Sequence, residues 1–402
     1  MLSFPDVFSD KFNASTDRRV AAWCARDQHT DLPRRPADVV GYYFEVRGKD
    51  RGEGRRETGV ICVKCIVCSV SYVVCQGETP FSHTVPNSSH PLLISSSLLP
   101  LLLFYNQDQP LWDVSAARAA SHASPPSRTP TDWVAAMRGL PASAAGKGQY
   151  VSWLRRRYAN GTRAGLEQAR AVYNIPASVQ TWDALISWDF GTVAATSSAV
   201  LAEDTLFLGV VAERLFGVGA AAVRRHDPGA LVFGQRFLSH DAPAVVLAAA
   251  GRHFDVVSVQ PSMFSPESRA AVEASAERLG NISRLAGGKP VFVADQATHF
   301  QEKSGPMQPN CGETTCVSEA EAGVLYGDFL AALQRRPAVV GYAHCQYINR
   351  VVDPGGDTSR QHLKQGLLHA DGTPHREMVD AITLANAKAS TRRPEDDNAL
   401  KK

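Results

Sequence analysis

Residues 231–260 read LVFGQRFLSHDAPAVVLAAAGRHFDVVSVQ, and this stretch decides the fold class. It holds two short apolar runs, 231–237 and 254–260, on either side of a predicted helix over 242–251. Apolar runs of this length that alternate with helices are typical of βαβ units, in which neighbouring strands are parallel. The stretch therefore predicts an α/β protein with a parallel sheet.

The same alternation continues on both sides of this unit. The further elements that the pattern predicts are the strands 38–45, 290–295 and 338–347 and the helices 203–226, 266–285, 318–334 and 378–388. A (β/α)₈ barrel and a doubly wound sheet both have this rhythm. Neither GxGxxG nor GxxxxGK[ST] follows any of the strands, so a nucleotide-binding doubly wound sheet has no support. We expect a TIM-barrel-like (β/α)₈ fold.

Polar and aromatic side chains gather where the predicted strands end. They are Glu45, Arg236, Gln260, Asp295, Gln296, Gln346 and Tyr347. Barrel enzymes carry their chemistry at the carboxyl ends of the strands. These residues are therefore the first candidates for a functional site.

The overall charge and the apolar runs exclude several classes of partner. Lys and Arg number 42 against 40 Asp and Glu, a formal net charge of +2, which gives no strong field for nucleic acid or an anionic membrane. The most lipid-like run, 91–105 (PLLISSSLLPLLLFY), contains three serines and two prolines. A spanning helix needs about 20 predominantly apolar residues, so we expect no membrane span.

Residues 46–107 differ from the sequence on both sides and show no steady period of 2 or 3.6. Read as codons, Val46 begins with GT and Gln107 can end in AG, and a pyrimidine tract would encode the Ser/Leu/Pro/Phe run before Gln107. These features predict an irregular insertion that is a translated intron. A genuine disordered insertion is one alternative. The other is a metal or iron–sulfur site on Cys62, Cys65, Cys68 and Cys75.

Outside this insertion, a series of motifs covers most of the chain. They are FPDVFSDKF (4–12), VVGYYFE (39–45), DQPLWD (108–113), TWDAL (181–185), DPGALVFGQRF (227–237), DVVSVQ (255–260), KPVFVADQ (289–296) and VVGYAHCQY (339–347). In this order they resemble agarase-like enzymes of glycoside hydrolase family 50, within the clan of retaining (β/α)₈ glycosidases. In that family FPDVF precedes the fourth barrel strand. The resemblance therefore implies an N-terminally truncated gene model with an incomplete barrel, strands four to eight.

The resemblance also assigns the catalytic positions. Retaining glycosidases use two carboxyl groups, an acid/base and a nucleophile. With 46–107 removed, Gln109 falls on the acid/base glutamate, and an amide can hydrogen-bond a glycosidic oxygen but cannot protonate it. Asp295 falls on the nucleophile, with a side chain one methylene shorter. The neighbouring carboxyl groups of Glu45 and Asp108 are the alternative proton donors.

Six further residues are expected to bind substrate by the same resemblance. They are Arg236, Gln260, Trp112, Gln346, Tyr347 and His344. Gln260 stands where the family has Asn, and His344 stands where it has a Trp that stacks on a sugar. For Arg236 a barrel-rim salt bridge remains the alternative, and for Trp112 a position in the core.

The sequence thus predicts a glycoside-hydrolase-like protein for retaining, agarase- or β-galactosidase-type hydrolysis of β-linked galactose-containing polysaccharide, with no cofactor and no metal. An inactive carbohydrate-binding barrel, that is a pseudoenzyme, and a cysteine-cluster metal protein are the alternatives. The expected domains are a barrel segment 1–45, the insertion 46–107, the rest of the barrel 108–390 and a disordered tail 391–402. No signal peptide is visible, and since the resemblance implies a missing N-terminus, localisation stays open between secreted and not secreted. The oligomeric state is not readable.

Overall fold

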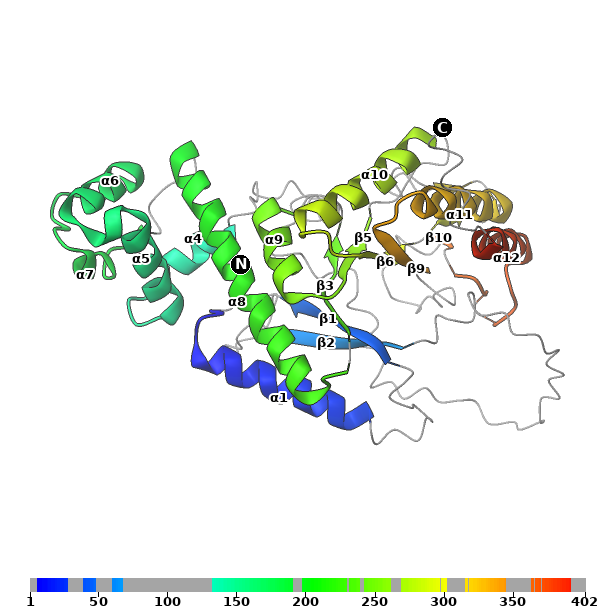
Figure 1. Cartoon of the computed structure of the whole chain (residues 1–402), viewed down its shortest axis with the longest axis horizontal. Helices are drawn as coiled ribbons and strands as arrows, with labels where there is room; N and C mark the ends of the chain where they lie inside the picture. Colours follow the sequence, from blue (N-terminus) through cyan, green and yellow to red (C-terminus); the bar gives the residue numbers. More distant parts are fainter. Residues whose placement is uncertain are drawn as a thin grey trace, which may run out of the picture.

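The computed structural model describes residues 6–27, 39–47, 60–67, 132–190, 197–229, 231–238, 242–261, 269–296, 298–301, 315–316, 318–344, 363–364, 366–369 and 371–391. Among these residues, β-strands and the helices that cover them form one α/β body. A group of short helices extends from one end of it (Figure 1).

Parallel strands form the centre of the protein. β1 (Val39–Arg47) pairs with β3 (Leu231–Gln235), and β4 (Phe237–Leu238) continues β3 beyond Arg236. β4 pairs with β5 (Val257–Gln260), β5 with β6 (Val291–Gln296), and β6 with β9 (Val339–His344), all in parallel. The strands follow one another in space in the order of the chain, as in one wall of a barrel. The predicted parallel α/β sheet is confirmed.

Helices cover one face of this sheet. The strands alternate with α8 (Ser198–His226), α9 (Ala244–His253), α10 (Arg269–Leu285), α11 (Glu319–Gln334) and α12 (Arg376–Thr391), while α1 (Asp10–Asp27) lies along α8. Every second residue of β5 and β6 belongs to the main core, namely Val257, Val259, Val291 and Val293, each fully buried. The period of two in these apolar side chains is what a sheet with one helix-covered face requires.

The opposite face of the sheet carries a second, smaller apolar cluster. It contains Phe233 and Val256, with Phe292 packed against them. The rings of Phe233 and Phe292 meet edge to face with centroids 5.4 Å apart. In a barrel wall this is the inward face, and its residues alternate with those that face the helices.

The group of short helices is held together by a buried polar network. It comprises α4 (Asp132–Arg138), α5 (Ala145–Arg157), α6 (Arg163–Tyr173) and α7 (Trp182–Leu185), which pack with α8. Arg138 lies 3.4 Å from Asp204 of α8, and the hydroxyl of Tyr150 hydrogen-bonds both Asp204 and Tyr173. Trp182 is buried, and its indole N–H donates to the Thr162 carbonyl at 3.2 Å, so this tryptophan is structural.

Helix α8 is long and apolar enough to cross a membrane by length and composition alone. In the structure 56% of its most apolar stretch is buried inside the protein. Phe207, Leu208 and Val211 are fully buried in the core that α8 shares with α1, α9 and β3. This is the packing of a core helix.

Eight residues of the expected insertion 46–107 form a strand, and the prediction that the segment as a whole is an irregular insertion is not tested. β2 (Val60–Val67) pairs antiparallel with β1, with Glu45 opposite Cys62 and Tyr42 opposite Cys65. Val and Ile dominate VICVKCIV, and such residues favour strands wherever an edge is free to pair. Cys68 and Cys75 lie outside the described residues, and the boundaries of the insertion stay a prediction.

A small sheet and a helix pair complete the fold. β7 (His299–Gln301) pairs in parallel with β8 (Thr315–Cys316) and antiparallel with β10 (Leu363–Lys364). α11 and α12 pack closely and run in the same direction. A Cβ added to Gly323 would lie 2.6 Å from the Cβ of Ala381, and one added to Gly327 would lie 3.3 Å from the Cβ of Ala385. Glycine at these two positions therefore allows the close approach of the helices.

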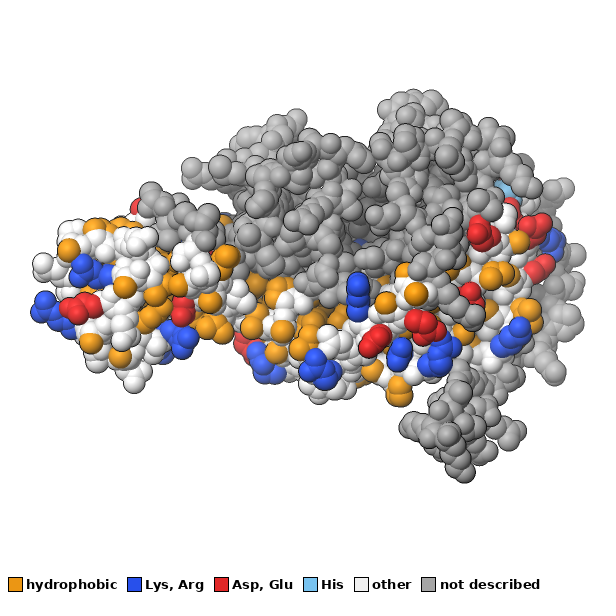
Figure 2. All heavy atoms as spheres, turned by 90° about the horizontal axis from the view of Figure 1, so that it is seen from above, with side chains coloured by type: hydrophobic (Ala, Val, Ile, Leu, Met, Phe, Trp, Pro, Cys, Tyr) orange, Lys and Arg blue, Asp and Glu red, His pale blue; other side chains and the backbone are white. Residues whose placement is uncertain are grey.

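Charged side chains of both signs are interspersed on the face of the molecule that Figure 2 draws. Among the residues coloured there, Lys and Arg lie next to Asp and Glu and form no large patch of one sign. This distribution agrees with the balanced composition, and the expected absence of a nucleic-acid partner stays a prediction.

Candidate active site

The carboxyl ends of the parallel strands meet at one edge of the sheet, which we call the carboxyl edge. β1 reaches it after Glu45, β5 at Gln260, β6 at Gln296 and β9 at His344. The register places Gln260 beside Leu238 and Gln296 beside His344. The backbones of Glu45 and Asp295 therefore end at the same edge, as the sequence predicts. Their side chains lie outside the part of the structure that is described.

Arg236 interrupts the strand that β3 and β4 form. Phe233 packs on the inward face against Phe292, whereas Phe237 packs against Phe216 of α8. Two residues four apart in a regular strand would share a face, so the strand contains a local irregularity. The pairing with β1 is also irregular here, because Tyr42 pairs with Val232 and Tyr43 with Gly234. Irregularities of this kind re-aim side chains and are frequent next to active sites.

This irregularity places two long polar side chains, Gln235 and Arg236, at the carboxyl edge. Their exposed fractions are only 6% and 7%. A buried guanidinium keeps its charge and requires acceptors, so Arg236 is suited to hold a carboxylate or a sugar hydroxyl in a fixed place. Whether it contacts substrate stays a prediction.

Gln235 and Ser258 are candidate site residues that the sequence interpretation missed. Neither Gln235 Oε1 nor Ser258 Oγ has a hydrogen-bond partner among the described residues, although both atoms are buried. Ser258 alternates with the core residues Val257 and Val259 and therefore faces inward, on the same side as Gln260. Buried polar atoms normally have partners, so these two point to a polar group that the described residues do not supply. The sequence feature that could have identified them is the presence of a glutamine and a serine in otherwise apolar strands.

His344 lies where β9 meets helix α11. Its ring centroid is 6.1 Å from that of Tyr326, and Tyr342, two residues earlier, packs on the same tyrosine at 5.0 Å. Burial raises the pKa of Tyr326 to about 12, so its phenol stays neutral at physiological pH. His344 therefore has a packing contact with α11, and its predicted role as a sugar-binding residue is not tested.

Five of the sequence-predicted site residues lie outside the described residues. They are Asp108, Gln109, Trp112, Gln346 and Tyr347. The structure thus brings the strand ends of the predicted site to one edge. The catalytic roles of Gln109, Asp295, Glu45 and Asp108 stay predictions.

The comparisons with known proteins give structural relatives and no sequence relatives. No family model matches the chain, and no curated protein does. Among solved structures, the chain is similar to an exo-β-agarase with a TM-score of 0.59 and 17% identity, over 96% of this chain and 39% of that chain. It is similar to PfGH50B with a TM-score of 0.53 and 18% identity, over 66% of this chain and 34% of that chain. It is also similar to an agarase, AgWH50C, with a TM-score of 0.51 and 22% identity, over 64% of this chain and 34% of that chain.

The chain spans between 34% and 39% of the length of these three relatives. At identities of 17% to 22%, the similarity concerns the fold. The order of parallel strands and the carboxyl edge described above are features of a TIM-barrel wall. The chain is therefore agarase-like in fold, as the order of its sequence motifs indicates.

Proposed function

We propose that this protein is a glycoside hydrolase of the retaining type that acts on β-linked galactose-containing oligosaccharides. The observation that carries the proposal is the likeness of 96% of the chain to an exo-β-agarase in fold, together with agarase-like motifs in the same order. Fold alone does not determine activity, so the proposal depends on the residues at the carboxyl edge. Asp295 supplies a carboxylate at the nucleophile position, and the buried Arg236 and Gln235 supply polar groups at the same carboxyl edge of the sheet.

The proposed activity is slow on natural linkages because of Gln109. Protonation of the leaving oxygen is general acid catalysis and contributes about 10²–10⁴-fold. Gln109 cannot supply this proton. Asp295 holds its carboxylate roughly 1 Å further back than a glutamate would, and a misplacement of that size costs about 10²-fold. An aryl galactoside with a good leaving group needs less protonation, so it is the substrate on which residual activity is expected.

The substitution Gln109→Glu tests this proposal in the full-length chain. We expect it to raise the turnover of agarose-type oligosaccharides by about 10²-fold or more and the turnover of the aryl galactoside much less. Asp295→Asn should abolish turnover of both substrates. Rapid hydrolysis of the natural linkage by the parent chain, unchanged in Gln109→Ala, would contradict the assignment and point to Glu45 or Asp108 as the proton donor.

The second candidate function is carbohydrate binding without turnover. The same amide at position 109 favours it, because an enzyme of this type requires a carboxyl group there. Calorimetric titration of the full-length chain with agarose-type oligosaccharides separates the two functions. Saturable binding, with no hydrolysis of either substrate by the parent or by Gln109→Glu, would favour the binding function.

A further inference from the structure

Two histidines flank a tight turn that precedes the last helix. The backbone N–H of His369 donates to the Thr373 carbonyl at 2.7 Å, and the N–H of Gly372 donates back to the His369 carbonyl at 3.0 Å. Gly372 has a φ of +87°, which favours glycine, and Leu368 forms an antiparallel bridge with Pro374. This turn holds the imidazoles of His369 and His375 side by side, with ring centroids 3.6 Å apart.

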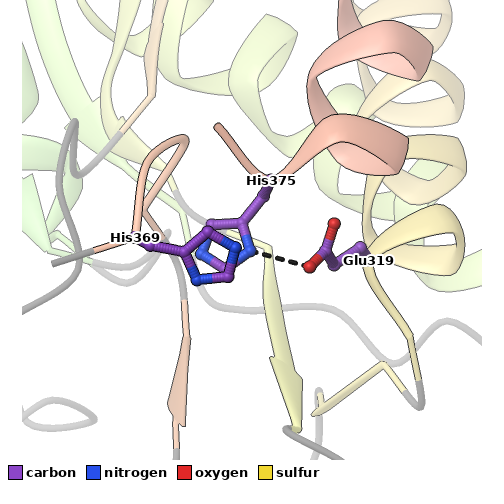
Figure 3. Close-up of side chains that lie close together, drawn as sticks. All are labelled: Glu319, His369 and His375. Atoms are coloured by element: carbon purple, nitrogen blue, oxygen red, sulfur yellow. Dashed lines mark hydrogen bonds and ion pairs between the residues drawn. The ribbon is translucent and has the colours of Figure 1, made fainter. Parts of the chain in front are cut away.

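A carboxylate from a distant part of the chain completes the group. Glu319 is the first residue of α11, and its Oε1 lies 2.8 Å from Nδ1 of His375 (Figure 3). Ser318 caps the same helix by accepting a hydrogen bond from the Glu321 N–H, which fixes the start of α11. Phe300 packs edge-on against His375 at 4.9 Å, and His375 is 1% exposed. Two structural elements thus hold all three side chains.

We propose that Glu319, His369 and His375 bind a divalent metal ion of the zinc type. One potential ligand atom from each residue lies within 4.8 Å of the other two. Two imidazoles and one carboxylate form a ligand set that Zn²⁺ uses, and imidazole selects zinc, copper and nickel over magnesium and calcium. Metal–ligand bonds of about 2.0–2.1 Å in a tetrahedron separate ligand atoms by about 3.3 Å, so the His375–Glu319 contact must open by about 0.5 Å.

The local charges accommodate a cation despite two nearby helix N-termini. The N-terminus of a helix carries partial positive charge, which disfavours a metal ion. The first turns of α11 and α12 contain Glu319, Glu321 and Glu377, whose three negative charges outnumber the positive charge of Arg376 in the same turns and offset this effect. Glu319 and His369 are half-buried, so solvent can reach the proposed ion and water could complete its coordination.

Comparable His–carboxylate pairs elsewhere in the described residues lack the second histidine. His253 lies 2.6 Å from Glu213, and His226 lies 3.1 Å from Asp17. These pairs serve as controls because they share the hydrogen bond between a histidine and a carboxylate, although their histidines are more exposed than His375. The second histidine, held by the turn, distinguishes the proposed site. A bound ion would join the turn, α11 and α12, and its role does not depend on the proposed glycosidase activity.

Titration of the metal-stripped full-length chain with zinc tests the site. Calorimetry measures zinc binding, and thermal unfolding measures the effect of zinc on Tm. We expect one zinc ion to bind tightly to each chain in a way that depends on His369. We also expect Tm to rise by several degrees at saturating Zn²⁺. His369→Ala should weaken this binding by at least about 100-fold and abolish the rise in Tm. Glu319→Gln should also weaken it. His253→Ala should leave both measurements unchanged.

The cysteines require a second variant, because thiolates also bind zinc. In the chain with Cys62, Cys65, Cys68 and Cys75 replaced by Ser, the zinc binding that depends on His369 should remain. If tight zinc binding disappears in this variant and persists in His369→Ala, the cysteines bind the metal and the proposal is wrong. The proposal also fails if no zinc binds to the parent chain, or if His369→Ala and His253→Ala behave alike.

Discussion

Arg138 and Asp204 form an ion pair with an N···O distance of 3.4 Å, and their side chains are 1% and 0% exposed. Burial raises the pKa of the Asp204 carboxyl, and the charge of Arg138 and the hydrogen bond from Tyr150 act against this rise. Removal of one partner of a buried pair leaves an uncompensated charge and typically costs about 3–5 kcal/mol. We therefore expect Arg138→Met to lower the free energy of unfolding by this amount in urea denaturation.

Two further measurements check this interpretation of the Arg138–Asp204 pair. The deficit of Arg138→Met should shrink as the pH falls, because burial raises the pKa of the Asp204 carboxyl and its protonation in the folded variant removes the uncompensated charge. Arg157→Ala, which removes an exposed ion pair with Glu203, should cost only about 0–1 kcal/mol. A deficit for Arg138→Met that stays below about 1 kcal/mol would contradict the importance of the buried pair.

At the scale of single residues, the sequence predicts which side chains are chemically suited to a site more readily than it predicts which of them lie together. The positions of Arg236 and Gln260 at strand ends could be predicted, because an apolar run stops where they begin. The burial of Gln235 could not, since it depends on an irregularity in β3 that no local pattern reveals. The grouping of Glu319 with His369 and His375 could not be predicted either, because about fifty residues of chain separate these positions.

At the scale of one element, Gly234 allows β3 to take its irregular course. Its φ is +66°, and a Cβ at this position would lie 2.0 Å from the ring of Phe254. Gly234→Ala should therefore destabilise the protein through overpacking, which typically costs about 1–3 kcal/mol, with backbone strain in addition. Gly229→Ala is the control, because nothing lies within 4 Å of its added Cβ. Equal unfolding free energies for the two variants would show that β3 tolerates a regular backbone.

The contact between α8 and α9 gives a prediction about pH. Burial opposes the ionisation of Glu213, but hydrogen bonds from Arg252 and His253 outweigh it and lower the pKa of this carboxyl. A lowered folded pKa contributes stability above the unfolded pKa of about 4.3, and this contribution is lost as the pH falls through the folded pKa. Because Glu213 and Arg252 are 39% and 57% exposed, Glu213→Gln should cost no more than about 1 kcal/mol at pH 7.

Urea denaturation of Glu213→Gln at several pH values measures this contribution. The difference from the parent chain should vanish in acid. A difference that is constant down to pH 3 would indicate a loss of packing rather than of charge. Glu167→Gln, at an exposed pair with Arg163 on α6, should show no difference at any pH.

Most elements could be predicted to within a few residues, since turn residues bound their apolar patterns. The helix expected at 318–334 is Glu319–Gln334, and the one expected at 266–285 is Arg269–Leu285. The helix expected at 203–226 begins earlier, at Ser198, because Val200 continues its buried stripe by one turn. The two-residue strands β8 and β10 could not be predicted, because their pairing partners and not their own sequences determine them.

At the scale of the whole molecule, β9 is the outer strand of the described sheet β4-β5-β6-β9. Its Val340 is 59% exposed, and an exposed apolar edge strand is a site for pairing with another chain. We expect the protein to self-associate at high concentration and Val340→Lys to reduce this, as measured by sedimentation velocity. Val324→Lys is the matched control, since Val324 is 60% exposed but lies on helix α11. An equal effect of both substitutions would point to general surface hydrophobicity.

β2 occupies one side of β1 along Val39–Arg47, and β3 occupies the other. Each backbone edge can hydrogen-bond to a single neighbour, so a strand from any other segment or molecule can join β1 on that side only after β2 leaves it. Pairing of β1 with β2 and pairing of β1 with a competing strand on that side exclude each other. Each competing strand that binds would therefore displace one copy of residues 60–67. A competing strand must therefore bind β1 more tightly than β2 does before the sheet can accept it on that side.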